Sequence, residues 1–116
     1  KIQNLIILGH SNCGGVEYSY KTLLDKKNIN NFEYINKWVS CLQHSYNNIP
    51  NDFSETEKIT FFEQENIKQS IKNLSEYDFI DKLINENKLN VIGLWYQINS
   101  GLIKFLDKNN SFIDLD

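Results

Sequence analysis

Hydrophobic residues change their spacing several times along the chain, and each change marks a predicted element. Four consecutive aliphatic residues, at positions 5–8, end at a glycine and predict a strand over residues 1–8 that is buried on both faces. After Gly15 the apolar residues repeat at the spacing of one helix face, which predicts a helix over residues 16–27. These apolar residues are Val16, Tyr20, Leu23 and Leu24. The chain therefore opens with a strand, a tight turn and a helix.

The middle of the chain has a second apolar stripe at helical spacing, after a polar turn over residues 25–31. It predicts one helix over residues 32–46. The stripe consists of Phe32, Ile35, Val39, Leu42 and Tyr46. The helix should end in a loop over residues 47–52, which contains the only proline of the chain.

Two helix-start signals follow this loop. Ser54 and Glu57 have the spacing of a capping box, so a long helix should begin there. Its buried side is expected to carry Ile59, Phe62, Ile67, Ile71 and Leu74. Ser75 and Asp78 repeat a similar signal, which predicts a short helix that ends near residue 86.

The last third of the chain is rich in residues that favour strands. We expect a strand over residues 89–98, a turn over residues 99–101, and an antiparallel strand over residues 102–106, with a polar tail beyond it. Strands separated by helices pair in parallel through a right-handed crossover. The predicted fold class is therefore α/β, a parallel sheet flanked by helices with an antiparallel edge strand. Such a thin sheet needs either upstream residues or a second copy of the chain to complete it.

Size and charge exclude several classes of function. The chain has 116 residues, which predicts at most one domain, and its net charge of −3 gives no electrostatic case for nucleic acid or an anionic membrane. No apolar run is long enough to span a membrane, and no signal peptide is visible. Two cysteines at this spacing indicate a reducing compartment, so a cytoplasmic location is expected.

Candidate chemistry concentrates in the glycine-rich turn over residues 9–15. His10 and Cys13 lie three residues apart, between the first strand and the first helix. The positive end of the helix dipole favours a thiolate at Cys13, and a thiolate with a neutral imidazole suits Zn²⁺. We expect the two side chains to converge on one point. Gly14 and Gly15 lack side chains and would let the backbone approach a bound ion or small ligand.

Other interpretations of the turn remain open on these residues alone. Cys13 could be a buried structural cysteine beside an ordinary histidine, or it could form a nucleophilic pair with His10, although no third group orients that pair. A phosphate-binding loop fits poorly, because the required lysine motif is absent. Cys41 is expected to be a small packing residue and His44 a solvated one. Metal ligation is the best single interpretation, but two ligands do not complete a zinc site.

These residues resemble a known family. The segment from Leu8 to Val16 is similar to a zinc-ligand motif of the β-class carbonic anhydrases, and residues 89–102 are similar to a downstream segment of the same family. Weaker similarity lies between them, around residues 29–38 and 65–74. The resemblance covers nearly the whole chain, so that residues 1–116 correspond to the C-terminal portion of one family domain.

The resemblance implies reversible hydration of carbon dioxide to bicarbonate by a zinc enzyme. His10 and Cys13 would be two zinc ligands, Gly14 would lie beside the metal, and Tyr96 would lie near the bicarbonate. The family also implies a homodimer or a higher homo-oligomer, with zinc sites close to the subunit interface.

One family feature is absent. The motif Cys-x-Asp-x-Arg, which in the family lies upstream and supplies a third ligand and an Asp–Arg pair, has no counterpart here, because the chain contains no arginine. We therefore assign no catalytic acid or base, and we expect this chain alone to be inactive. Two rivals remain: a truncated, non-catalytic domain that acts only in folding or dimerisation, and a generic α/β binding domain in which the His-x-x-Cys spacing is a coincidence.

Overall fold

The computed structural model describes residues 1–25 and 33–115, which form nine helices and strands within those ranges. In chain order these are β1 (Asn4–His10), α1 (Gly14–Leu24), α2 (Glu33–Ser40), α3 (Gln43–Asn47), α4 (Glu55–Ser75), α5 (Asp78–Asn85), β2 (Asn90–Gln97), β3 (Leu102–Leu106) and β4 (Phe112–Asp114). They make two compact units, one of residues 1–11 with 67–116 and one of residues 12–66. The expectation of a single domain stays a prediction.

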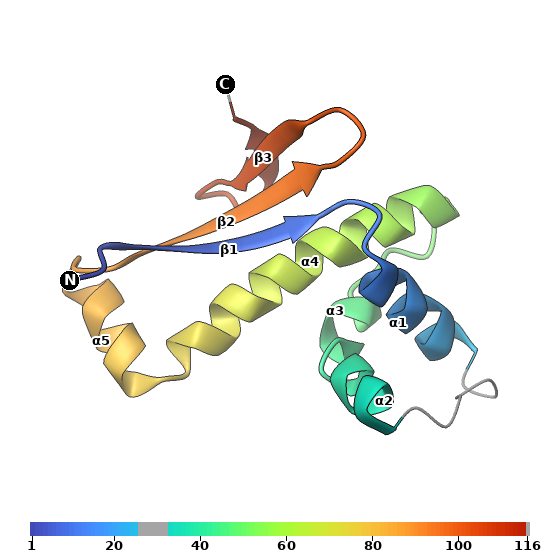
Figure 1. Cartoon of the computed structure of the whole chain (residues 1–116), viewed down its shortest axis with the longest axis horizontal. Coiled ribbons are helices and arrows are strands. Elements are labelled where there is room, and N and C mark those ends of the chain that lie inside the picture. Colours follow the sequence, from blue (N-terminus) through green and yellow to red (C-terminus); the bar gives the residue numbers. More distant parts are fainter. Residues whose placement is uncertain (26–32, 116) are drawn as a thin grey trace. The chain divides into compact units, whose positions relative to one another are not determined.

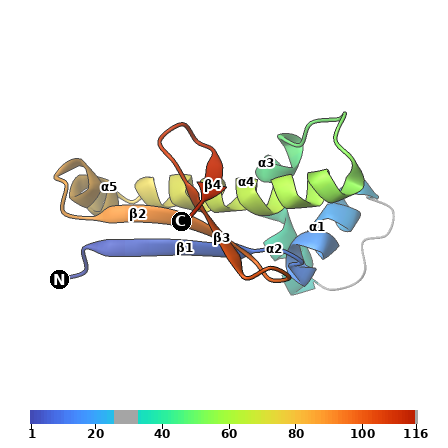
Figure 2. The same cartoon turned by 90° about the horizontal axis from the view of Figure 1, so that it is seen from above.

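The first unit contains a four-stranded sheet in the order β1-β2-β3-β4. β1 and β2 run side by side and parallel, in a register that pairs Asn4 with Asn90 and His10 with Tyr96 (Figure 1). β2 with β3 and β3 with β4 are antiparallel, and β3 crosses over β2 when the sheet is seen from above (Figure 2). The predicted α/β class, with parallel pairing and an antiparallel strand at residues 102–106, is confirmed.

One face of the sheet is covered by the second half of α4. Gly93, in the middle of β2, allows this close approach, since a Cβ placed there would lie 3.0 Å from Ile71 Cδ1 and 3.2 Å from Ile67 Cγ2. Trp95, two residues further along the same face, is only 3% exposed. The helix therefore packs directly onto the backbone of the strand.

The other face of β1 is open, which corrects the expectation that this strand is buried on both faces. Its side chains alternate between half-buried and exposed, and Ile6 and Leu8 are 53% and 63% exposed. The physical reason is position: β1 is the edge strand of the sheet, and a helix covers only one of its faces. Alternation of this kind is normal for a sheet with one solvated face.

The C-terminal segment forms structure that we expected only as a polar tail. The Asp107 carboxylate accepts hydrogen bonds from the backbone N–H groups of Asn109 and Ser111, both at 2.9 Å, and Asn110 has a φ of +62°. This turn returns the chain as β4 against β3. The predicted turn before β3 is confirmed, with Gly101 at a φ of +71°.

The second unit has its own hydrophobic core, built from α1, α3 and the first half of α4. Val16, Tyr20, Leu42 and Phe62 form this core, and Phe62 is fully buried. The capping box predicted at the start of α4 is confirmed. The Ser54 N–H donates to Glu57 Oε2 at 2.8 Å and the Glu57 N–H donates to Ser54 Oγ at 3.3 Å. The bond from the Ser54 N–H, followed by the Ser54 hydroxyl, lowers the pKa of the Glu57 carboxyl.

The single helix expected over residues 32–46 is instead two helices, α2 and α3, and Phe32 lies outside the described residues. The Ser40 hydroxyl donates to the Lys37 carbonyl at 2.6 Å, while the Cys41 N–H donates to the Trp38 carbonyl at 3.0 Å. The backbone hydrogen bonds thus change from the i→i−4 spacing of an α-helix to the i→i−3 spacing of a 3₁₀ turn. The reason is that a side chain competes for the Lys37 carbonyl, which would otherwise continue the helix. The end expected for the first helix at residue 27 also lies outside the described residues, whereas α1 itself ends at Leu24.

The second helix-start signal was wrong in its details. Ser75 does not cap α5, because its hydroxyl donates to the Lys72 carbonyl at 2.7 Å as the last residue of α4. α5 begins at Asp78 after Tyr77, whose side chain makes no capping bond. In the part of the chain that the structure describes, we find no helix with both the length and the apolar character needed to cross a bilayer.

Candidate functional site

His10 is the last residue of β1, at the carboxyl end of the strand. Its Nδ1 lies 2.8 Å from the backbone carbonyl oxygen of Ser11. A carbonyl oxygen only accepts, so Nδ1 carries the proton and donates this bond. The lone pair of the neutral imidazole is then on Nε2. An imidazole held by its other nitrogen in this way has the arrangement typical of metal-bound histidines.

Ser11 joins the ends of β1 and β2. Its N–H donates to the Tyr96 carbonyl at 2.9 Å, and its Oγ accepts a bond from the Ile98 N–H at 2.9 Å. Because the register pairs His10 with Tyr96, these two residues lie on the same face of the sheet, and Tyr96 is 37% exposed. The structure therefore brings together two of the residues that the sequence singled out. The role of Ser11 was missed.

Cys13 stands at the N-cap of α1, as expected. Asn12, with a φ of +55°, makes the sharp turn that leads into it. The Cys13 carbonyl accepts the first helical bond, from the Glu17 N–H at 2.9 Å. Its half-buried thiol packs against the hydrophobic core of the second unit. The sulfur therefore lies at the start of α1.

Glu63, in α4, is a further functional candidate that sequence reasoning missed. It is only 4% exposed, and its Oε1 accepts a hydrogen bond from the Cys13 N–H at 3.4 Å. A buried carboxylate at a helix N-terminus is stabilised by the unpaired N–H groups there. Its position next to Phe62 on the buried side of a predicted helix was the only sequence signal.

The two glycines after Cys13 have different surroundings. A Cβ placed on Gly14 would meet nothing within 4 Å, whereas one placed on Gly15 would lie 2.8 Å from Cη2 of Trp38. Gly15 is therefore needed for the packing of α2 against α1. Gly14 leaves open space at the first position of α1, and its expected place beside a metal stays a prediction.

Among the described residues, His10 and Cys13 belong to no larger group of potential metal ligands. Within residues 1–25 and 33–115, no three His, Cys, Asp or Glu side chains are grouped so that they could hold a metal ion. Cys41 is exposed, which corrects the expectation that it is a packing residue, and His44 is exposed as expected. His10 ends a strand of one unit and Cys13 begins a helix of the other, so convergence of their side chains stays a prediction.

Curated proteins with related sequences are carbonic anhydrases. The protein from Helicobacter pylori named carbonic anhydrase is 32% identical over 108 residues, which cover 88% of this chain and 48% of that protein. Beta carbonic anhydrase 3 of Arabidopsis thaliana is 28% identical over 103 residues, covering 86% of this chain and 40% of that protein. The chain thus spans about half the length of these relatives.

Solved structures and a family model agree with these relatives. The β-carbonic anhydrase CcaA has a TM-score of 0.83 at 21% identity and covers 98% of this chain and 56% of its own, which shows a shared fold. One of two tetrameric β-carbonic anhydrases from Sordaria macrospora has a TM-score of 0.74 at 27% identity, covering 91% of this chain and 53% of its own. The family model described as carbonic anhydrase matches residues 1–103. The chain therefore belongs to the carbonic anhydrase family, in its β class.

Proposed function

We propose that this chain supplies two zinc ligands, Nε2 of His10 and the thiolate of Cys13, to an enzyme that reversibly hydrates carbon dioxide to bicarbonate. The observation that carries the proposal is the hydrogen bond from His10 Nδ1 to the Ser11 carbonyl. This bond leaves the lone pair of Nε2 available to bind a metal. It occurs three residues before an N-cap cysteine, inside the range matched by the family model. An imidazole nitrogen and a thiolate are the donors that Zn²⁺ prefers.

Zinc supplies an acidified water, which is a nucleophile for carbon dioxide at neutral pH. The residues of this chain orient and shape the site. Ser11 fixes the imidazole of His10, and the N-terminus of α1 stabilises the thiolate of Cys13. Tyr96, beside His10 in the register, is the residue we assign to the substrate pocket. Gly14 adds no side chain where substrate would approach.

The ligand count favours a specific rival as well. A catalytic zinc has three protein ligands, and the described residues hold no group of three. The second candidate is therefore a non-catalytic carbonic-anhydrase-like domain that acts in folding or dimerisation. Zinc content separates the two candidates.

The first prediction concerns the two cysteines. Cys13→Ala should abolish stoichiometric zinc in the intact protein, because it removes a ligand, while Cys41→Ala should leave zinc unchanged, because that thiol is exposed and remote from the turn in sequence. Elemental analysis of the purified proteins measures this. Equal zinc in the wild type and in Cys13→Ala would remove the metal interpretation and favour the non-catalytic rival.

We also propose that the protein works as a homo-oligomer in the cytoplasm. The open face of β1 exposes Ile6 and Leu8, and α5 exposes Phe79 at 67%; exposed apolar surfaces of this kind mark contacts with other subunits. The Sordaria macrospora neighbours are described as tetrameric. Both cysteines are free thiols, in keeping with a reducing compartment.

A further inference from the structure

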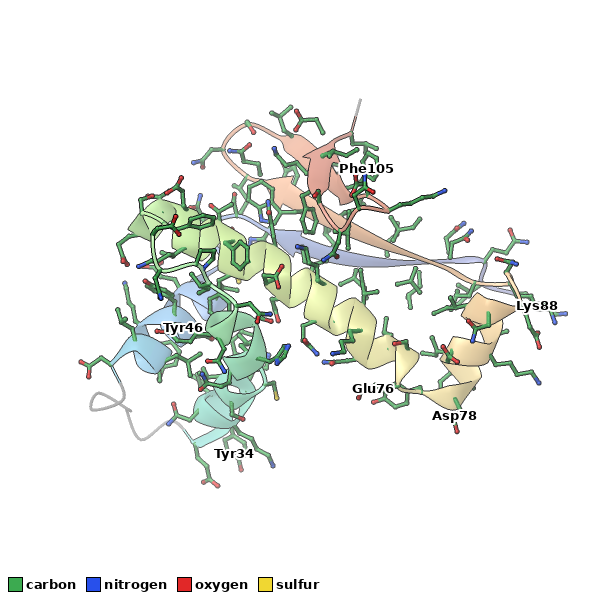
Figure 3. The ribbon with its side chains drawn as sticks, turned by 180° about the vertical axis from the view of Figure 1, so that it is seen from behind. Tyr34, Tyr46, Glu76, Asp78, Lys88 and Phe105 are labelled. Atoms are coloured by element: carbon green, nitrogen blue, oxygen red, sulfur yellow. The ribbon has the colours of Figure 1, made fainter. Side chains whose placement is uncertain are left out.

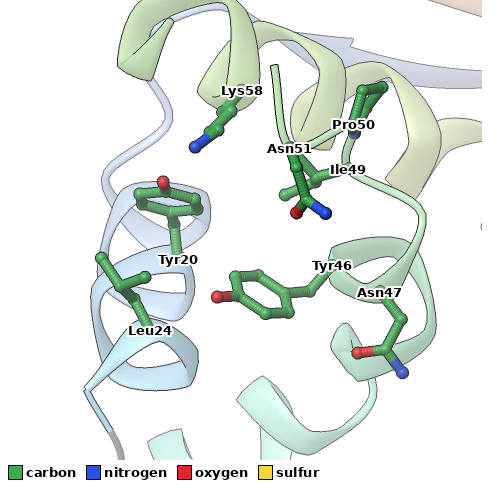
Figure 4. Close-up of a pocket in the computed structure, with 8 residues that line it drawn as sticks. All are labelled: Tyr20, Leu24, Tyr46, Asn47, Ile49, Pro50, Asn51 and Lys58. Atoms are coloured by element: carbon green, nitrogen blue, oxygen red, sulfur yellow. The ribbon is translucent and has the colours of Figure 1, made fainter. Parts of the chain in front are cut away.

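The second unit contains a pocket that the proposed reaction does not use. It has a volume of about 450 Å³ and is lined by residues of α1, α3, the loop that follows α3, and the first turns of α4 (Figure 4). Its volume lies in the range of small-molecule sites. None of the residues proposed to bind zinc or carbon dioxide lines it.

Two tyrosines form the aromatic wall of the pocket. The rings of Tyr20 and Tyr46 have their centroids 5.9 Å apart and are tilted by 53°. Tyr46 is held from behind by Phe62, in an edge-to-face contact at 6.0 Å. Leu24 and Ile49 complete the apolar part of the lining. Tyr20 is only 4% exposed, so the half-buried ring of Tyr46 is the aromatic surface that a ligand can reach.

A positively charged and a negatively charged group lie close to the Tyr20 hydroxyl. The Tyr20 hydroxyl donates to the Glu55 carboxylate at 3.0 and 3.2 Å, and the Lys58 ammonium lies 3.8 Å from Glu55 Oε1. Figure 4 shows the Lys58 amine directed toward the Tyr20 hydroxyl, with the Tyr46 hydroxyl and the Asn51 carboxamide pointing into the pocket.

The Tyr20 hydroxyl is a permanent donor in this arrangement. Burial and the neighbouring carboxylate of Glu55 raise the pKa of Tyr20 to about 12. The hydroxyl therefore stays protonated at neutral pH and keeps its bond to Glu55. This bond holds the Glu55 carboxylate next to two residues of the lining, Tyr20 and Lys58, although Glu55 itself does not line the pocket.

The balance of charges decides which ligand fits. An anion would approach Lys58 but would meet the carboxylate of Glu55, while a cation would approach Glu55 but would meet the ammonium of Lys58. A neutral hydroxyl group both donates and accepts, so it can bond to either residue and also to the Asn51 carboxamide. The C–H faces of a sugar ring pack well on tyrosine rings.

We infer that this pocket binds a neutral polyol of monosaccharide size, with the ring against Tyr46 and the hydroxyls bonded to Lys58, Asn51 and the Tyr46 hydroxyl. The pocket is separate from the residues of the proposed zinc site. Binding of a sugar and hydration of carbon dioxide can therefore succeed or fail independently of each other.

NMR titration of the ¹⁵N-labelled chain tests this inference, with D-glucose, D-galactose and D-mannose as probes and with acetate and methylammonium as charged comparisons. At least one hexose should shift the amide signals of Tyr46 and Asn51 in a saturable way, and the charged compounds should not. Failure of all three hexoses to bind, or saturable binding of acetate or methylammonium alone, would overturn the inference.

Variants then locate the binding. Tyr46→Phe removes only a hydroxyl, and Lys58→Met removes the ammonium group with its N–H donors while keeping an unbranched side chain. Each should weaken hexose binding about tenfold through loss of a hydrogen bond. The matched controls are Tyr34→Phe and Lys72→Met. Both residues are exposed and outside the pocket, and Figure 3 shows Tyr34 on α2, where it is 87% exposed. Equal hexose affinity in all four variants would also overturn the inference.

Discussion

At the scale of one residue, the hydrogen bond between His10 and Ser11 decides which ring nitrogen of His10 could bind a metal. A histidine can present either ring nitrogen, and the 2.8 Å contact with the Ser11 carbonyl selects Nε2. Ser11 is itself fixed by a backbone bond to Tyr96 in β2 and by a bond from the Ile98 N–H to its own Oγ. The group that orients the imidazole is therefore a backbone carbonyl, and its position depends on the end of the parallel pair.

The adjacent glycines give a matched pair of substitutions. Gly15→Ala should destabilise the protein by about 1–3 kcal/mol, because the new methyl group would lie 2.8 Å from the Trp38 ring. Gly14→Ala should be neutral or stabilising by up to about 1 kcal/mol, since its Cβ meets nothing and alanine favours a helix. Urea unfolding followed by circular dichroism measures both. Equal changes in the two variants would contradict this account of the Trp38 contact.

Residue types and spacing single out His10 and Cys13 as candidate ligands, but they do not identify the residues that hold this turn in place. His10 and Cys13 are three residues apart, so their common turn is visible in the sequence. The groups that hold this turn are remote: Glu63 lies 50 residues from Cys13, and the Ile98 N–H bonded to Ser11 lies 87 residues away. Such partners are brought near only by tertiary packing, which hydrophobic periodicity does not encode.

At the scale of elements, helix starts can be compared through two serines. Ser54→Ala should destabilise the protein by about 1 kcal/mol, because it removes the acceptor for the Glu57 N–H at the first turn of α4. Ser75→Ala should change stability by less than about 0.5 kcal/mol, because Ser75 caps no helix N-terminus. The midpoints of urea unfolding, compared at an unchanged m-value, measure both changes in stability. A larger loss in Ser75→Ala would show that its bond to Lys72 matters more than the capping box.

Helices and turns that follow from a few neighbouring residues were predicted. Those that depend on which of two groups bonds to the same carbonyl were not. The capping box at Ser54 and the turn at Gly101 follow from a few neighbouring residues. The break between α2 and α3 depends on whether the Lys37 carbonyl bonds to a side chain or to the backbone, and both choices fit the apolar stripe. β4 has only three residues and exists because the Asp107 turn returns the chain onto β3.

At the scale of the whole molecule, β1 leaves one edge of the described sheet without a neighbouring strand. β1 is an edge strand in the described sheet, its outer face is apolar, and it ends in a proposed zinc ligand. An uncovered apolar edge is normally paired or covered in a stable protein. The expectation that the sheet needs upstream residues or a second copy stays a prediction, and it has a catalytic consequence.

That consequence is that the 116-residue chain, taken alone, should be inactive in carbon dioxide hydration even if the whole protein is active. It offers two ligands where a catalytic zinc has three, so the metal would bind weakly and its water would lack a fixed position. Stopped-flow measurement of the zinc-loaded chain, with zinc alone and His10→Ala as controls, makes the comparison.

Rates for the chain should equal those of both controls. Turnover clearly above them would contradict the ligand count and would require a third ligand from elsewhere. Cys41 is the first residue to test in that case, because it is the other thiol of the chain. If Cys41→Ala then kept full turnover, a residue from a second subunit would remain, and activity would fall on dilution as the oligomer dissociates.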